Sequence, residues 1–184
     1  RGSGDMYYRG SNFLHTLRAV VNDDTLWRAV LLGLNQEFFQ QTVGTEAIVD
    51  YMSELVGFDV APLAKQYLMD TRLPVLEYGF RDGQLRYRYS QVGVDFTMPM
   101  DVKVGISGPS EHELLVSLET RLEPTTRWQE LDIAELIPLK EFARFGLLVN
   151  DESDFLADIH WKLKIETNFY VGSLEMNPGE RGVE

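Results

Sequence analysis

Two adjacent tyrosines near the start of the chain, Tyr7 and Tyr8, carry side chains that could do chemistry. A phenol with a pKa near ~10 stays protonated at neutral pH, so it can donate a hydrogen bond to an oxyanion that develops during a reaction. Losing one such donor costs roughly 10²–10³-fold in rate. Neighbouring residues on a helix point about 100° apart, so both phenols cannot serve one site. Taken alone, the pattern favours core or interfacial tyrosines.

The three histidines do not predict a metal site. His112 and Glu113 begin like the helix of a zinc protease, but that motif needs a second histidine four residues after the first, where this chain has Val116. The surrounding residues also alternate as in a strand, which would put His112 and Glu113 on opposite faces. His160 is expected on the polar face of a strand, and His15 beside an apolar helix stripe as a packing or capping residue. We therefore expect neither metal-ligating nor cofactor-binding residues in this chain.

Other polar groupings are better explained by structure than by chemistry. The spacing suggests no Ser-His-Asp arrangement and no glycine-rich phosphate loop. Acid pairs at 23–24 and 151–152 fall where helix caps and turns are expected. Arg86 and Arg88 are expected on the solvent face of a hairpin.

Composition limits the classes of partner. The net charge is −12, which argues against nucleic acid or an anionic membrane as a partner, since both require clustered Lys and Arg. Cysteine is absent, so thiolate metal sites, disulfides and cysteine nucleophiles are excluded. No apolar run approaches the ~18 residues of a membrane span. The compartment is left open.

Hydrophobic spacing predicts four helices in the first seventy residues. These cover 6–22, about 24–38, 45–56 and 61–69; Asn22-Asp23-Asp24 and Thr45 are expected as N-terminal caps, and Gly57 as a C-terminal stop. The predicted core stripes are Phe13, Leu14, Leu17, Val20 and Val21; then Leu26, Trp27, Val30, Leu31, Leu34 and Phe38; then Ile48, Tyr51, Met52, Leu55 and Val56.

The period changes to that of strands after Leu73-Pro74. Strands are expected at 75–80, 84–89, 100–106, 114–122 and 161–165, with a hairpin turn at Asp82-Gly83. The predicted class is α+β, in which an all-helical segment (1–72) precedes an antiparallel β-sandwich-like domain (73–176) and a flexible tail (177–184). Residues 133–158 fit neither template.

Several short motifs occur in an order that is typical of a known family. They are Tyr7-Tyr8-Arg9-Gly10, Leu17-Arg18, Asp23-Asp24, Trp27, the segment Thr45–Gly57, Tyr67-Leu68 and Leu73-Pro74. Over residues 5–78 the chain resembles the part of M1-family metallopeptidases, the aminopeptidase N and leukotriene A4 hydrolase group, that follows the zinc site. The resemblance continues more loosely through Met98-Pro99, Trp128 and Asn168-Phe169-Tyr170.

The resemblance assigns one functional residue. The family opens this helix with Tyr-x-Lys-Gly, whose tyrosine is the oxyanion donor and maps to Tyr7; Tyr8 occupies the variable position, and Arg9 replaces the lysine with its charge kept. The family's His-Glu-x-x-His helix, third zinc ligand and amine-recognising residues all precede this tyrosine. The resemblance thus implies the C-terminal part of a zinc aminopeptidase, with the zinc ligands absent from this chain.

Further expectations follow from that assignment. In the intact parent, zinc-bound water would attack a peptide substrate while Tyr7 stabilises the oxyanion. The chain alone is expected to be inactive, to expose apolar helix surface and to self-associate through it. A non-catalytic interaction or scaffold module, an M1-like relative without the zinc motif, is the open alternative, in which Tyr7 is an interfacial tyrosine.

Overall fold

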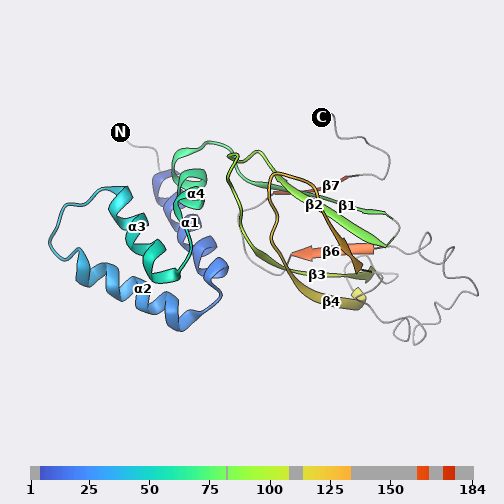
Figure 1. Cartoon of the computed structure of the whole chain (residues 1–184), viewed down its shortest axis with the longest axis horizontal. Coiled ribbons are helices and arrows are strands. Elements are labelled where there is room, and N and C mark those ends of the chain that lie inside the picture. Colours follow the sequence, from blue (N-terminus) through green and yellow to red (C-terminus); the bar gives the residue numbers. More distant parts are fainter. Residues whose placement is uncertain (1–4, 82, 108–113, 134–160, 166–171, 177–184) are drawn as a thin grey trace, which may run out of the picture.

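The structure is a computed structural model that describes residues 5–81, 83–107, 114–133, 161–165 and 172–176. Helices come first and strands follow, which confirms the predicted α+β class. Figure 1 shows the helices gathered at one end and the strands at the other. The expected tail 177–184 and most of the unassigned stretch 133–158 lie outside the described residues, so those predictions stand untested.

The helical part follows the predicted order. It comprises α1 (Asp5–Val21), α2 (Asp24–Glu37), α3 (Thr45–Val56), α4 (Ala61–Ala64) and η1 (Lys65–Met69). The fourth predicted helix is in fact α4 continued by the π-helical turn η1. Such wide turns are rare and are often found at functional or strained positions.

The caps explain where these helices begin and end. Asp23 caps α2, because its carboxylate accepts hydrogen bonds from the backbone N–H of Thr25 at 2.8 Å and of Leu26 at 3.0 Å. Gly57 ends α3 in the left-handed region, with φ of 79°, as the sequence predicted. The prediction for Thr45 is wrong: Thr45 is the first helical residue, and Gly44 precedes it without a side-chain cap.

The predicted helix stripes are too wide. Leu14, Leu31 and Leu55 are 38%, 38% and 37% exposed, although each was expected in the core. Leu14 and Leu31 each follow a buried residue by one position, which turns the side chain by about 100°; Leu55 follows buried Met52 by three positions, a net turn of about 60°. With only a few short helices packed together, each buries one narrow face. The buried helix residues that form it are Phe13, Leu17, Val20, Trp27, Val30, Val49 and Met52.

The first sheet has the strand order β5-β2-β1-β7. It contains β1 (Val75–Arg81), β2 (Gln84–Ser90), β5 (Gln129–Asp132) and β7 (Gly172–Glu175). The β1–β2 hairpin turns at 82–83, where Gly83 has a φ of 75°. Strand β7 pairs parallel to β1, whereas the other pairs are antiparallel.

The second sheet has the order β4-β3-β6 and is antiparallel throughout. Its strands are β3 (Met100–Ser107), β4 (Leu114–Leu122) and β6 (Trp161–Ile165), close to the predicted ranges. The buried side chains of this sheet and of the first belong to one cluster that also includes the buried helix residues. The helices and strands therefore share a continuous core; the division at residue 72 remains a prediction.

Replacing Asp23 with alanine removes the side-chain cap of α2. We expect the free energy of unfolding to fall by about 1 kcal/mol, because two backbone N–H groups lose their acceptor. Urea denaturation followed by circular dichroism measures the change. Asp50→Ala removes the same charge from an exposed position within α3 and should leave the midpoint nearly unaltered. An equal loss in both variants would contradict the capping role.

Candidate functional site

Tyr7 lies in the first turns of α1, and its side chain is 76% exposed. Tyr8 is 73% exposed, so neither tyrosine belongs to the core. The two side chains diverge by about 100° around the helix, as expected for neighbours. The interfacial interpretation of both residues and the oxyanion role of Tyr7 remain open, and the core interpretation is wrong.

Helix α1 divides into an inner and an outer face. Phe13, Thr16 and Leu17 are buried, while Leu14 and Arg18 are exposed at helical spacing from Tyr7. An i, i+7, i+11 pattern places these exposed side chains along one outer strip of the helix. The candidate phenol therefore stands on the surface of α1 that faces away from the core.

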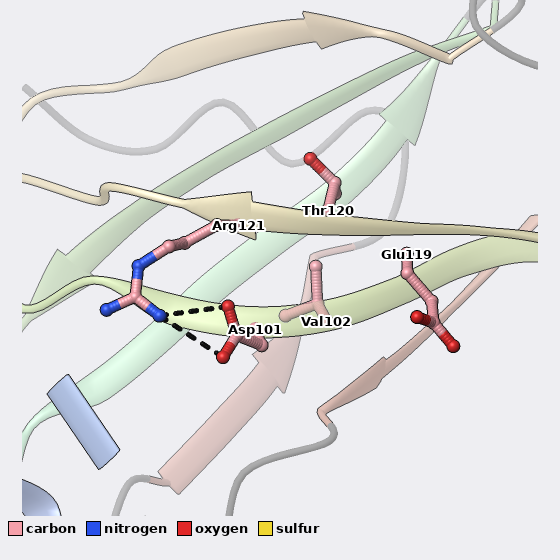
Figure 2. Close-up of a pocket in the computed structure, with 5 residues that line it drawn as sticks. All are labelled: Asp101, Val102, Glu119, Thr120 and Arg121. Atoms are coloured by element: carbon pink, nitrogen blue, oxygen red, sulfur yellow. Dashed lines mark hydrogen bonds and ion pairs between the residues drawn. The ribbon is translucent and has the colours of Figure 1, made fainter. Parts of the chain in front are cut away.

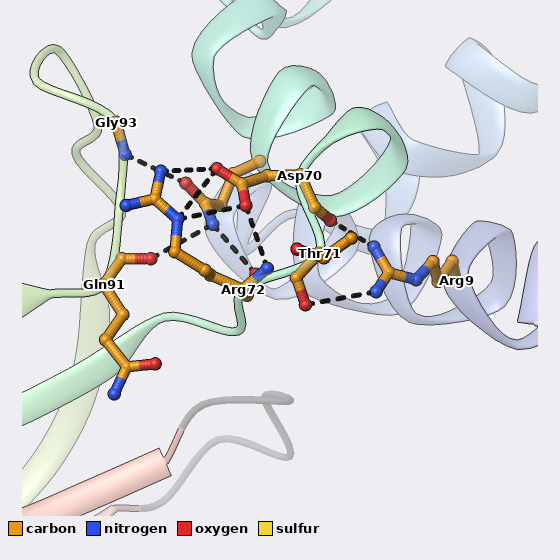
Figure 3. A network of polar contacts seen from close by, with 7 residues as sticks. Arg9, Asp70, Thr71, Arg72, Gln91 and Gly93 are labelled. Carbon is orange, nitrogen blue, oxygen red and sulfur yellow. Dashed lines mark hydrogen bonds and ion pairs between the residues drawn. The ribbon is translucent and has the colours of Figure 1, made fainter.

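Arg9 lies on the inner side of the same turn. Its guanidinium donates one hydrogen bond to the Asp70 carbonyl oxygen and a second, at 3.3 Å, to the Thr71 carbonyl oxygen. Figure 3 shows the Arg9 side chain reaching from α1 to the segment that follows η1. Arg9 thus ties the turn of Tyr7 to the chain just before the first strand.

A buried glutamine continues this connection into the strands. Gln66 is 3% exposed, and its amide donates to the Arg72 carbonyl at 3.0 Å and to the Gln91 carbonyl at 3.4 Å. Its side-chain oxygen accepts from the Gly93 backbone N–H at 3.0 Å. Leaving a buried polar group without partners costs about 1–3 kcal/mol, so this set of bonds fixes η1 against the loop that connects β2 with β3.

The turn after η1 is closed by Asp70 and Arg72. The Asp70 carboxylate accepts from the Arg72 backbone N–H at 2.9 Å and from its Nη2 at 2.6 Å. The side-chain hydrogen bond from Arg72, followed by the backbone one, lowers the pKa of Asp70 to about 2. The carboxylate is therefore ionised throughout the neutral range.

Tyr67 follows Gln66 in η1 and is also buried. Its hydroxyl lies 3.7 Å from the Met98 sulfur, and burial raises its pKa to about 12. A smaller opposing effect comes from the Thr16 hydroxyl, although Thr16 falls short of a well-formed hydrogen bond. Tyr67 is thus a protonated packing residue that connects the helices to the strands, and it does not face solvent as Tyr7 does.

A shallow cavity of about 350 Å³ lies over β3 and β4, and Figure 2 shows its lining. Arg121 donates to the Asp101 carboxylate at 3.0 Å and to the Val20 carbonyl at 2.6 Å, so it also joins β4 to the end of α1. Glu119 is paired with Lys103 at 3.0 Å. The charged side chains of this cavity are therefore paired with one another and do not point together at a common ligand position.

A second open cavity, of about 500 Å³, lies at the turn between α1 and α2. His15, Arg18 and Asp24 line it, together with Ala19 and Asn22. Arg18 forms a two-pronged ion pair with Asp24 at 2.8 and 2.9 Å; through this hydrogen bond and its charge it lowers the pKa of Asp24. His15 is exposed and not packed in the core. Eight residues separate it from Tyr7, a rise of about 12 Å along the helix, so this cavity is not at the phenol.

Arg86 and Arg88 are more than a solvent face. Their guanidiniums lie 5.6 Å and 4.5 Å from the centre of the Trp128 ring. Arg88 also pairs with Glu77 at 2.7 Å, and its side chain is only 28% exposed. The predicted alternation in this strand is confirmed, since Leu85, Tyr87 and Tyr89 are buried. The stacking on Trp128 was not predicted, because it depends on a residue about forty positions away in the sequence.

Within the described ranges no group of three His, Asp or Glu side chains could hold a metal ion. His112, His160 and the acid pair at 151–152 lie outside those ranges. Of the acid pair at 23–24, Asp23 caps α2 as the sequence predicted, whereas the ion pair of Asp24 with Arg18 was not predicted. No helix in the described part of the chain is both long enough and apolar enough to cross a bilayer.

Comparison with known proteins assigns this chain to no family. No protein-family model matches the chain, and no curated protein does so. Among solved structures, Legionella pneumophila aminopeptidase A, determined in complex with aspartic acid, aligns with 68% of this chain at 10% sequence identity and a TM-score of 0.48. The aligned chain spans 15% of the length of that protein.

Lowering the pH tests the Asp70–Arg72 turn. Because the pKa of Asp70 is depressed from 3.8 to about 2 in the folded state, its contribution to stability is present above about pH 4 and is lost as the pH falls toward 2. Asp70→Asn should therefore reduce the loss of urea stability over that interval. Asp95→Asn, at an exposed loop position, is the matched control. Identical pH profiles for the wild type and the Asp70 variant would contradict this assignment.

Proposed function

We propose that this chain is the C-terminal part of an M1-type zinc metalloaminopeptidase, to which it contributes Tyr7 as a hydrogen-bond donor. The proposal is supported by the ordered motifs over residues 5–78 and by one observation above all. Tyr7 is 76% exposed on the outer side of α1, while the inner side of the same turn is anchored by Arg9. A phenol that must reach a substrate needs an accessible side chain, and the helix turn that carries it must be held in place.

The chemistry assigned to this chain is confined to its own residues. In peptide-bond hydrolysis the carbonyl oxygen gains negative charge, and the Tyr7 O–H would donate to it. Such a donor is most effective where water is excluded. Another part of the larger protein would have to cover the outer strip of α1 at Tyr7 and Leu14. Tyr8 points away from that strip and is assigned no role.

The described residues do not fit zinc. No three of their His, Asp or Glu side chains converge, and His15 stands alone on the surface of α1. The resemblance implies that the zinc ligands belong to a segment outside this chain, where zinc would supply its chemistry. The oxyanion contact is therefore the only part of the chemistry that the proposal assigns to this chain.

The purified chain should bind no stoichiometric zinc and release no amino acid from peptides. Inductively coupled plasma mass spectrometry after dialysis against zinc measures the first property, and an aminoacyl-p-nitroanilide assay measures the second. One zinc per chain, or turnover that chelators abolish, would contradict the proposal.

Reading the gene upstream of the Arg1 codon identifies the protein in which Tyr7 can be tested. If an in-frame His-Glu-x-x-His and a later glutamate are found, Tyr7→Phe in that protein should lower kcat roughly 10²–10³-fold, because the oxyanion loses one donor. Tyr8→Phe is the matched control and should retain activity. Full activity in the Tyr7 variant would remove its catalytic assignment.

A non-catalytic interaction or scaffold module is the second candidate. It is favoured by the large apolar side chains that the helical part of the chain exposes. Among them are Tyr7, Tyr8 and Leu32 on helices, at 76%, 73% and 52%, and Phe39 in the turn after α2, at 69%. An upstream region without the zinc motif would support this candidate and would make Tyr7 an interfacial residue. Self-association of the chain through this surface remains a proposal under either function.

A further inference from the structure

The position of Tyr7 depends on the helix turn that carries it. With 76% of its side chain exposed, little packing restrains the phenol directly. The first four N–H groups of a helix also lack helical partners, so a first turn readily frays. Whatever holds this turn therefore determines where the hydroxyl stands.

Arg9 is the side chain that holds it. Two positions after Tyr7 the helix has turned through about 200°, which directs Arg9 to the inner side. There its guanidinium reaches the Asp70 and Thr71 carbonyl oxygens, sixty residues further along the chain. A planar guanidinium can serve two neighbouring acceptors at once, whereas an ammonium is a single point charge.

The acceptors of Arg9 are themselves fixed to the strands. The Asp70 carboxylate closes its turn on Arg72, and the Arg72 carbonyl accepts from the buried Gln66 amide at 3.0 Å. Gln66 in turn accepts from the Gly93 N–H at 3.0 Å, in the loop between β2 and β3. In Figure 3, Gly93, Arg72, Asp70 and Arg9 follow one another from the strand loop to α1.

We infer that Arg9 is a positioning residue, which fixes the turn bearing Tyr7 to the strand-rich part of the chain through Asp70, Arg72 and Gln66. This inference rests on the proposed function for the importance of Tyr7, but the anchoring itself does not require catalysis. It gives the loop between β2 and β3 a role in the site, because this loop helps to set the place of the phenol without touching it.

Amide hydrogen exchange of the full 184-residue chain, followed by NMR, tests the anchor. In Arg9→Gln we expect exchange of the amides of residues 9–13 to rise at least about tenfold, while the amides of α2 and α3 are unaffected, since local opening is independent of global unfolding. Arg9→Lys keeps the charge and one bond and should recover part of the protection. Arg28→Gln, at an exposed position in α2, is the matched control.

Two results would overturn the inference. One is unchanged exchange of residues 9–13 in Arg9→Gln; the other is a uniform rise over the whole chain, which would indicate general destabilisation. If Arg9→Gln proves difficult to produce, Gln66→Met gives a second test. It should also raise the exchange of the amides of residues 9–13. Neither measurement needs zinc or substrate, so failure of the anchor is distinguishable from failure of Tyr7→Phe in the larger protein.

Discussion

The hydrogen bonds of one buried amide determine how the two halves of the molecule are joined. Gln66 places a donor and an acceptor in a dry environment, where both must be satisfied by groups at defined distances. Its partners precede β1 and follow β2 in the sequence, so η1 cannot shift without breaking several bonds together. The contacts of Tyr67 with Met98 and of Arg121 with the Val20 carbonyl act in the same direction at other points of the boundary.

Helix α1 illustrates how one element serves two environments. Its inner face supplies Leu17 to the core and Arg9 to the joint, while its outer face leaves Tyr7 accessible. The two demands are compatible because a helix separates neighbouring side chains by a wide angle. An exposed aromatic residue on a free helix would be poorly defined in space. On a helix whose inner face is held by hydrogen bonds, the same residue can be presented to a substrate or to a partner surface.

Local patterns made much of the fold predictable. Features that depend only on residues close in sequence were predicted, and the structure confirms them. They are the alternation of Leu85, Tyr87 and Tyr89, the cap at Asp23 and the stop at Gly57. Strands β5 and β7 were not predicted because each has four residues and owes its conformation to its partner strand. The roles of Arg9 and Gln66 were also hidden, since their acceptors and donors lie far away in the sequence. Tyr7 itself was singled out by resemblance, and its residue type and neighbours alone did not distinguish it from an ordinary surface tyrosine.

The parallel pairing of β7 with β1 has a consequence for how the chain acquires its structure. Val75 is aligned with Gly172, so the first strand of the β region must wait for a segment far later in the chain to be synthesised. Contacts between such distant segments form late, because closing a long loop costs entropy before any pairing compensates for it. During translation one edge of β1 would remain open while the hairpin with β2 is already possible. The ribosome-bound chain therefore passes through a stage in which an unpaired strand edge is available to chaperones or to neighbouring chains.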